Sequence, residues 1–209
     1  MSTSSSTLAP FASFEARCAK LPYLPPAVVL LPINVVDVDS RSQAELTVMF
    51  ERAMPNHQTM GLTQARIGHN ATIDVKGLQQ ESRGRACVRA HVRIELFMQP
   101  ITVFVASELA RNACRRAAVH EHEMKHVEVY ETYLREAAAD LARSLPDVVG
   151  DRVYYAANLA EAQGELAQTL SRFLDEFQEK SAGQLGARQA LVDSASEYAR
   201  VANACGAVK

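Results

Sequence analysis

The fold is decided by residues 107–145, which read SELARNACRRAAVHEHEMKHVEVYETYLREAAADLARSL. Strong helix formers (Ala, Leu, Arg and Glu) dominate this stretch, and it contains neither Gly nor Pro. Ser107 is a favourable N-cap, and Pro146 and Gly150 are typical of a turn after the helix. We therefore expect one long helix here, and the segments on either side determine the fold class.

The residues before this helix favour β-strands. Apolar and polar residues alternate from Val88 to Leu96, which is typical of a strand with one buried face. Ile101–Val105 follows as a short apolar run, so a hairpin with Val88–Leu96 is plausible. Further candidate strands are Ala27–Val38, Leu46–Phe50 and Ala71–Val75.

The residues after the long helix favour two more helices, at about 151–180 and 188–204, separated near Gly183 and Gly186. The sequence thus predicts an α+β fold, with a small antiparallel sheet followed by a bundle of three long helices. We expect a disordered leader and linker over residues 1–26 and a single domain over 27–209. Within that domain, residues 27–106 would form the β-region and residues 107–205 the helical region.

Composition excludes several classes of partner. The net charge is −2, there is no Trp, and aromatic residues make up only 6% of the chain, so a nucleic-acid partner is not expected. The most apolar stretch, residues 27–36, is interrupted by Pro32 and is well below the ~20 residues that span a bilayer. Residues 1–10 lack the basic and apolar segments of a signal peptide, so we expect either a cytoplasmic protein or export by a signal that this sequence lacks.

The four cysteines favour an exported protein over a cytoplasmic one. They are even in number, and no two form a CxxC pair of the kind that holds structural zinc. Cys18 and Cys205 lie near opposite ends of the chain, so we expect one disulfide between them and a second between Cys87 and Cys114. Such bridges would place the protein in the periplasm or outside the cell. Four buried free thiols are the alternative.

Chemistry is concentrated in His122-Glu123-Met124-Lys125-His126, an HExxH string inside the predicted long helix. His122 and His126 are four residues apart, so on a helix both rings project from one face and can bind one zinc ion. Glu123 lies beside that face and can act as the general base toward a metal-activated water. Apolar residues share the histidine stripe, which favours a buried face over a solvated one. His120 points elsewhere and is expected either at the surface or as a neighbour of the ligands.

A catalytic zinc site needs a third protein ligand and an open position. The residues after His126 do not continue as HxxGxxH, so this ligand must come from a later helix. The acidic candidates there are Glu161, Glu165, Asp193 and Glu197. We favour Glu197 because it lies on the last predicted helix, and a position of that helix near the site would explain a disulfide at Cys205.

The run from Cys87 to His126 resembles a bacterial family of uncharacterised, predicted zinc-dependent proteases of the zincin type. The matching residues are Cys87, Cys114, His122, Glu123 and His126, with the Asp193–Tyr198 string near the end as a further match. The resemblance implies that the two histidines bind zinc and that Glu123 is the catalytic base. Members of this family often have a late histidine, whereas no histidine follows His126 in this chain.

The expected function is that of a zinc-dependent metallopeptidase, a hydrolase acting on a peptide or protein substrate. One alternative is a non-catalytic helical interaction protein with a degenerate or structural metal site. Its partner could be another protein or a second copy of the chain. Another alternative is metal-dependent hydrolysis of a substrate that is not a protein. HExxH favours the first over the interaction protein, because structural zinc normally has four protein ligands and no adjacent general base.

Overall fold

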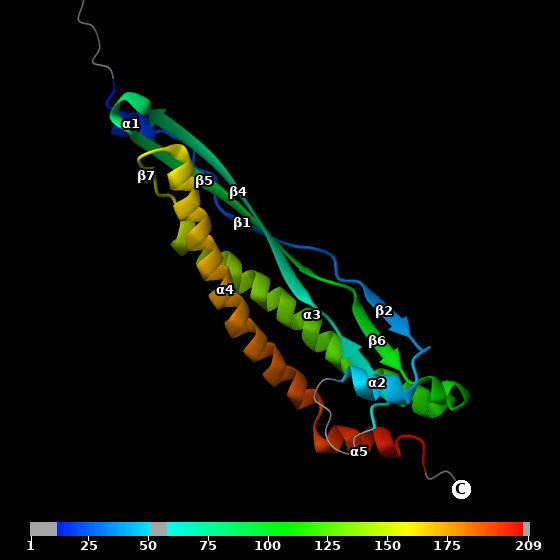
Figure 1. Ribbon diagram of the computed structural model, residues 1–209. Coiled ribbons are helices and arrows are strands. Elements are labelled where there is room, and N and C mark those ends of the chain that lie inside the picture. Colours follow the sequence, from blue (N-terminus) through cyan, green and yellow to red (C-terminus); the bar gives the residue numbers. More distant parts are fainter. Residues whose placement is uncertain (1–11, 51–57, 207–209) are drawn as a thin grey trace, which may run out of the picture. The chain divides into compact units, whose positions relative to one another are not determined.

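The computed structural model describes residues 12–50 and 58–206, and Figure 1 shows its elements. The protein is α+β, as predicted, with several helices and small sheets. Its residues divide into two compact units. The first unit comprises Met1–Pro26, Thr72–Arg93 and Leu145–Phe173, and the second comprises Ala27–Ala71, Ile94–Ser144 and Leu174–Lys209.

The second unit contains a sheet with the strand order β2 (Val35–Val38), β6 (Ile101–Val105) and β3 (Gly61–Gln64). β6 runs parallel to β2 and antiparallel to β3, so this sheet is mixed and not purely antiparallel. The predicted hairpin of β6 with Val88–Leu96 is wrong. The backbone N–H of Ile101 donates to the carbonyl of Asn34 at 2.8 Å, which directs the chain into this other sheet.

Both faces of β6 are covered, which explains its nearly continuous apolar sequence. On one face Ile101 and Val103 pack in a cluster with Val127 of helix α3 (Ala113–Val149). On the other face Phe104 packs with Leu46 of helix α2 (Gln43–Met49). The central strand therefore lies between two helices, and α3 is fixed by its apolar side against the sheet.

Helix α2 corrects the prediction of a strand at Leu46–Phe50. Ser42 and Glu45 form a reciprocal capping box, in which the Ser42 hydroxyl accepts from the Glu45 N–H and the Glu45 carboxylate accepts from the Ser42 N–H. Leu46 is fully buried. The local cap and this one buried contact outweigh the alternating pattern. Residues 51–57, which follow, lie outside the described part of the chain.

Helix α3 confirms the long helix, although its limits differ from those predicted. Ser107 begins a short 3-10 helix (Ser107–Arg111), and the cap of α3 is Asn112, whose side-chain oxygen accepts from the Arg115 N–H at 3.0 Å. α3 continues through Pro146 to Val149. Gly150 follows with a φ of +26°, which terminates the helix.

The two later helices also have different limits. Helix α4 runs without interruption over Leu159–Val192, and helix α5 covers only Ala195–Asn203. The predicted break at Gly183 and Gly186 is therefore wrong, and two helices are long while the third is short. A glycine inside a helix costs only about 1 kcal/mol, which a long helix tolerates. In the described part of the chain, no helix has the length and apolar character needed to cross a bilayer.

The longer sheet has the order β1 (Ala27–Leu30), β5 (Arg85–Met98) and β4 (Ile67–Gln80), and β7 (Tyr154–Ala156) also pairs with β5. β5 confirms the predicted alternation, because every second side chain from Val88 to Leu96 is buried. β7 lies where the second long helix was predicted to begin. Its residues Tyr154–Ala156 pair with Ala86–Val88 of β5.

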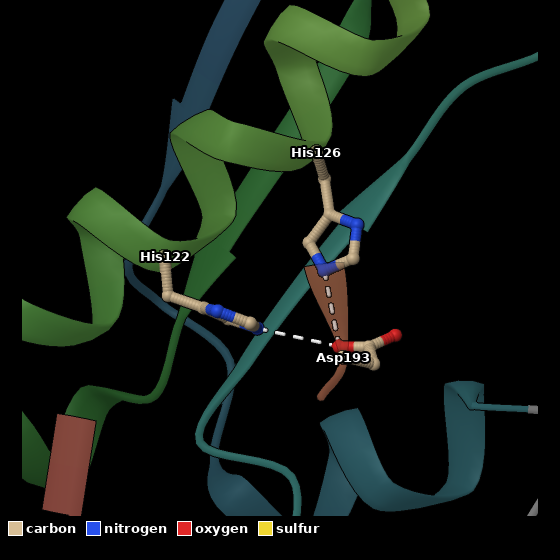
Figure 2. A group of neighbouring side chains, drawn as sticks. All are labelled: His122, His126 and Asp193. Atoms are coloured by element: carbon tan, nitrogen blue, oxygen red, sulfur yellow. Dashed lines mark hydrogen bonds and ion pairs between the residues drawn. The ribbon is translucent and has the colours of Figure 1, made fainter. Parts of the chain in front are cut away.

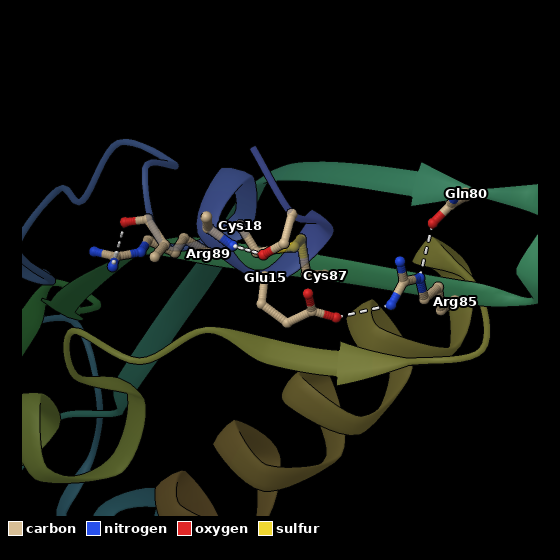
Figure 3. Close-up of a disulfide and its surroundings, with 9 residues drawn as sticks. Glu15, Cys18, Gln80, Arg85, Cys87 and Arg89 are labelled. Atoms are coloured by element: carbon tan, nitrogen blue, oxygen red, sulfur yellow. Dashed lines mark hydrogen bonds and ion pairs between the residues drawn. A yellow bond between two sulfur atoms is a disulfide. The ribbon is translucent and has the colours of Figure 1, made fainter. Parts of the chain in front are cut away.

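The first unit is closed by a disulfide between Cys18 and Cys87, shown in Figure 3. Cys18 ends helix α1 (Phe14–Cys18), which lies inside the stretch predicted to be leader and linker; residues 1–11 are outside the described residues. Phe14 is buried with both cysteines, and the Arg85 guanidinium lies over its ring. The predicted pairing of Cys18 with Cys205 is wrong, because each cysteine bonds to the one that folding brings next to it within its own unit.

Candidate metal centre

The two histidines of the HExxH string lie on one buried face of α3, as predicted. Their ring centroids are 5.0 Å apart, and the rings are nearly perpendicular. His122 is 6% exposed, and the side chain of His126 is 12% exposed. Gln189 of α4, Asp193, and Tyr198 of α5 lie against these rings and shield them from solvent. By contrast, His120 contacts Asp37 at 3.0 Å with a partly exposed side chain, consistent with the predicted surface position.

The structure brings Asp193 to these two rings (Figure 2). Asp193 lies between α4 and α5, and its Oδ1 is 3.4 Å from Nε2 of His122 and 3.2 Å from Nε2 of His126. Potential ligand atoms of the three residues all lie within 4.8 Å of one another. Two ligands held at 2.0–2.1 Å by a tetrahedral zinc ion would be about 3.3 Å apart. The observed separations therefore fit such an ion.

Hydrogen bonds hold Asp193 in its charged form. Burial opposes this, but hydrogen bonds from His122, His126 and Tyr198 outweigh it, so the pKa of Asp193 is well below its usual range. The Tyr198 hydroxyl donates to Oδ1 at 2.8 Å. The pKa of His126 is raised: burial lowers it, but the hydrogen bonds with Asp193 and Gln189 have the larger combined effect. Asp193 is therefore a charged carboxylate that can attract a cation.

Glu123 is buried beside the histidines and is not part of the three-residue group. It is 4% exposed, and the Thr63 hydroxyl donates to its Oε2 at 2.8 Å. Burial raises the pKa of Glu123, while the hydrogen bond from Thr63 and the two nearby histidines lower it. Gly61 leaves room for the carboxylate, because a Cβ there would lie 2.4 Å from Oε1 of Glu123. In β3, Thr63 therefore orients the Glu123 carboxylate and Gly61 leaves space for it.

No family model, curated protein or solved structure matches this chain. The resemblance drawn from the HExxH string thus remains a prediction, and the functional argument rests on the geometry of the site.

Glu197, predicted as the third ligand, has other partners. Its Oε1 accepts from Lys125 and from Arg200, both at 2.7 Å, and lies 3.4 Å from Nδ1 of His122. The hydrogen bonds from Arg200 and Lys125 hold the pKa of Glu197 well below its usual range. Glu197 therefore faces the ring nitrogen that is turned away from Asp193.

The other acidic candidates lie in the first unit and are exposed. Glu161 accepts from the Ala157 N–H at 2.9 Å, just before the beginning of α4. Glu165 is one helical turn further along. Neither belongs to the group of residues that could hold a metal.

Thr63 and Gln189 are among the site residues that were not predicted. Oε1 of Gln189 lies 2.6 Å from Nδ1 of His126. A threonine in a strand and a glutamine in a helix carry no sequence signal, because their roles depend on residues about 60 positions away along the chain.

A second disulfide, between Cys114 and Cys205, holds α5 near this centre. It links the beginning of α3 to the residues that follow α5. Within α5, Val201 packs against a cluster that includes Val105 and Val119. This pairing replaces the predicted bridge between Cys87 and Cys114. The disulfide and the apolar contact together restrain the helix that carries Glu197.

Proposed function

We propose that the second unit is a zinc-dependent metallopeptidase. One observation carries the proposal: two imidazole nitrogens and a carboxylate oxygen converge beside a buried glutamate that is not part of the group. His122, His126 and Asp193 would be the metal ligands, and Glu123 the general base. Asp193 thus takes the place that the sequence had suggested for Glu197.

The donor set, together with the HExxH spacing on a helix, favours zinc in a catalytic role. Two imidazoles and one carboxylate suit zinc, and three protein ligands leave one position open for water or substrate. A structural zinc would use four protein ligands, whereas the group found among the described residues has three. This difference favours the enzyme over the interaction protein with a structural metal.

When bound, zinc would supply Lewis acidity at the open position, polarising a carbonyl group and lowering the pKa of water. The chain supplies the base. Glu123 would take a proton from the attacking water and pass it to the leaving amine. Burial raises the pKa of Glu123 above its ordinary value, the direction that suits a general base, and Thr63 keeps the carboxylate oriented.

The test measures zinc content and peptide hydrolysis on the same preparations. The wild type should hold about one zinc per chain and cleave peptides from an unstructured protein such as casein. Glu123→Gln should keep the zinc but lose about 10²–10⁴-fold in rate, because an amide cannot accept the proton. Glu128→Gln, an exposed position on the same helix, is the matched control. His126→Ala should lose the zinc.

Two results would overturn the proposal. The first is a wild-type protein that stays free of zinc after incubation with the metal. The second is Glu123→Gln hydrolysing peptides as fast as Glu128→Gln. Zinc binding with no hydrolysis of any peptide would favour the interaction protein or a substrate that is not a protein.

A further inference from the structure

Gln189, on α4, contacts His126 at two points, one on the backbone and one on the ring. The backbone contact determines how the amide group is oriented toward the ring. Its amide nitrogen donates to the backbone carbonyl of His126 at 3.3 Å. Its amide oxygen, Oε1, lies 2.6 Å from Nδ1 of the His126 ring. The side chain of Gln189 therefore contacts both the backbone and the ring of His126.

The orientation of this amide follows from its partners. A backbone carbonyl can only accept, so the amide group facing it must be the NH₂. The group facing Nδ1 is then the oxygen, which also only accepts. Nδ1 must therefore carry the proton and donate.

The same logic determines the other ring nitrogen. In a neutral imidazole one nitrogen donates and the other has a lone pair. Nε2 faces Asp193 at 3.2 Å and donates to it while the ring is charged; a metal ion can bind there only after that proton leaves, and with the proton kept on Nδ1 the lone pair is then on Nε2. Nε2 is thus the nitrogen available to a metal ion.

We propose that Gln189 is a positioning residue, which holds the Nδ1–H of His126 and so presents Nε2 to the metal. This inference rests on the proposed zinc site but concerns a residue that binds neither metal nor substrate. A hydrogen-bond acceptor on the far nitrogen fixes the ring orientation and makes the ligand more basic, and losing one typically weakens metal affinity by about 10–100-fold.

The experiment compares zinc affinity in four full-length proteins: wild type, Gln189→Met, Gln189→Glu and Gln184→Met. Methionine is about as long as glutamine but has no strong acceptor, so Gln189→Met should bind zinc about 10–100-fold more weakly. Gln189→Glu keeps an acceptor for Nδ1–H and should remain close to the wild type. Gln184→Met makes the same change at an exposed position of α4 and should have no effect.

A second measurement detects the hydrogen bond itself. In nitrogen-15 NMR spectra of the zinc-loaded wild type, His126 should have a protonated Nδ1 whose proton exchanges slowly with water. That slow exchange should be lost in Gln189→Met and kept in Gln189→Glu. If Gln189→Met matches Gln184→Met in both zinc affinity and proton exchange, the role of Gln189 is refuted while the zinc site stands. A wild type that binds no zinc would refute both.

Discussion

Replacing Gly61 by alanine should separate catalysis from metal binding. Gly61 begins β3 and pairs with Val105 of β6, so its backbone has little freedom to move. The added Cβ would lie 2.4 Å from Oε1 of Glu123 and 2.7 Å from Cγ1 of Val119. Both neighbours are side chains on α3, and one of them is the proposed general base.

The size of the effect follows from these distances. Ordinary contacts begin at 3.4 Å, so the Glu123 carboxylate must move by about 1 Å, which strains the 2.8 Å hydrogen bond from Thr63. Misplacing a catalytic group by about 1 Å can cost 10²-fold, and we expect kcat/KM to fall by about that factor. Overpacking should also lower the free energy of unfolding by about 1–3 kcal/mol. Zinc affinity should not change, because no metal ligand is displaced.

Three assays on the same preparations check this: peptide hydrolysis, zinc titration and urea unfolding. Gly183→Ala is the control, because its Cβ would meet nothing within 4 Å and alanine favours a helix by about 1 kcal/mol. The reasoning fails if Gly61→Ala retains the activity of Gly183→Ala, because the carboxylate beside Gly61 would then not be the base. Loss of zinc together with activity would show that β3 supports the ligands as well.

Three further predictions concern the ligands and the disulfides. Asp193→Ala should abolish zinc binding, whereas Glu197→Ala should only weaken it by about 10–100-fold. Equal losses in a zinc titration would contradict the assignment of Asp193 as the ligand and of Glu197 as a neighbour of His122. Replacing Cys114 and Cys205 together by serine should lower the free energy of unfolding by about 4–5 kcal/mol, from the chain entropy of a loop with a separation of 91 residues, as measured by urea unfolding. In protein from its native source, non-reducing peptide mapping should find Cys18 linked to Cys87 and Cys114 linked to Cys205; alkylation of all four thiols would exclude an oxidising compartment.

The sequence alone determined those features that repeat over short distances. The alternation from Val88 to Leu96 predicted a strand with one buried face, and a strand is found there. The helix formers around His122 predicted a long helix, and the four-residue spacing predicted that both histidines share a buried face. These patterns are readable because strand and helix periods are properties of neighbouring residues.

Tertiary structure alone decided which distant segments meet. Ile101–Val105 has the composition of a strand, but nothing in it specifies β2 and β3 as its partners. The four cysteines allow three pairings, and their positions along the chain pointed to a wrong one. Contacts of this kind depend on where the whole chain places each segment, which local periodicity does not encode.

The proposed site combines both kinds of information. Two of its ligands are four residues apart on one helix and are visible in the sequence, whereas Asp193 lies 67 positions beyond His126. Asp193 and Glu197 are both acidic and lie near each other in the sequence, so composition and spacing could not separate them. The path of the chain between α4 and α5 brings Asp193 to both Nε2 atoms, while Lys125 and Arg200 hold Glu197 beside the far nitrogen of His122.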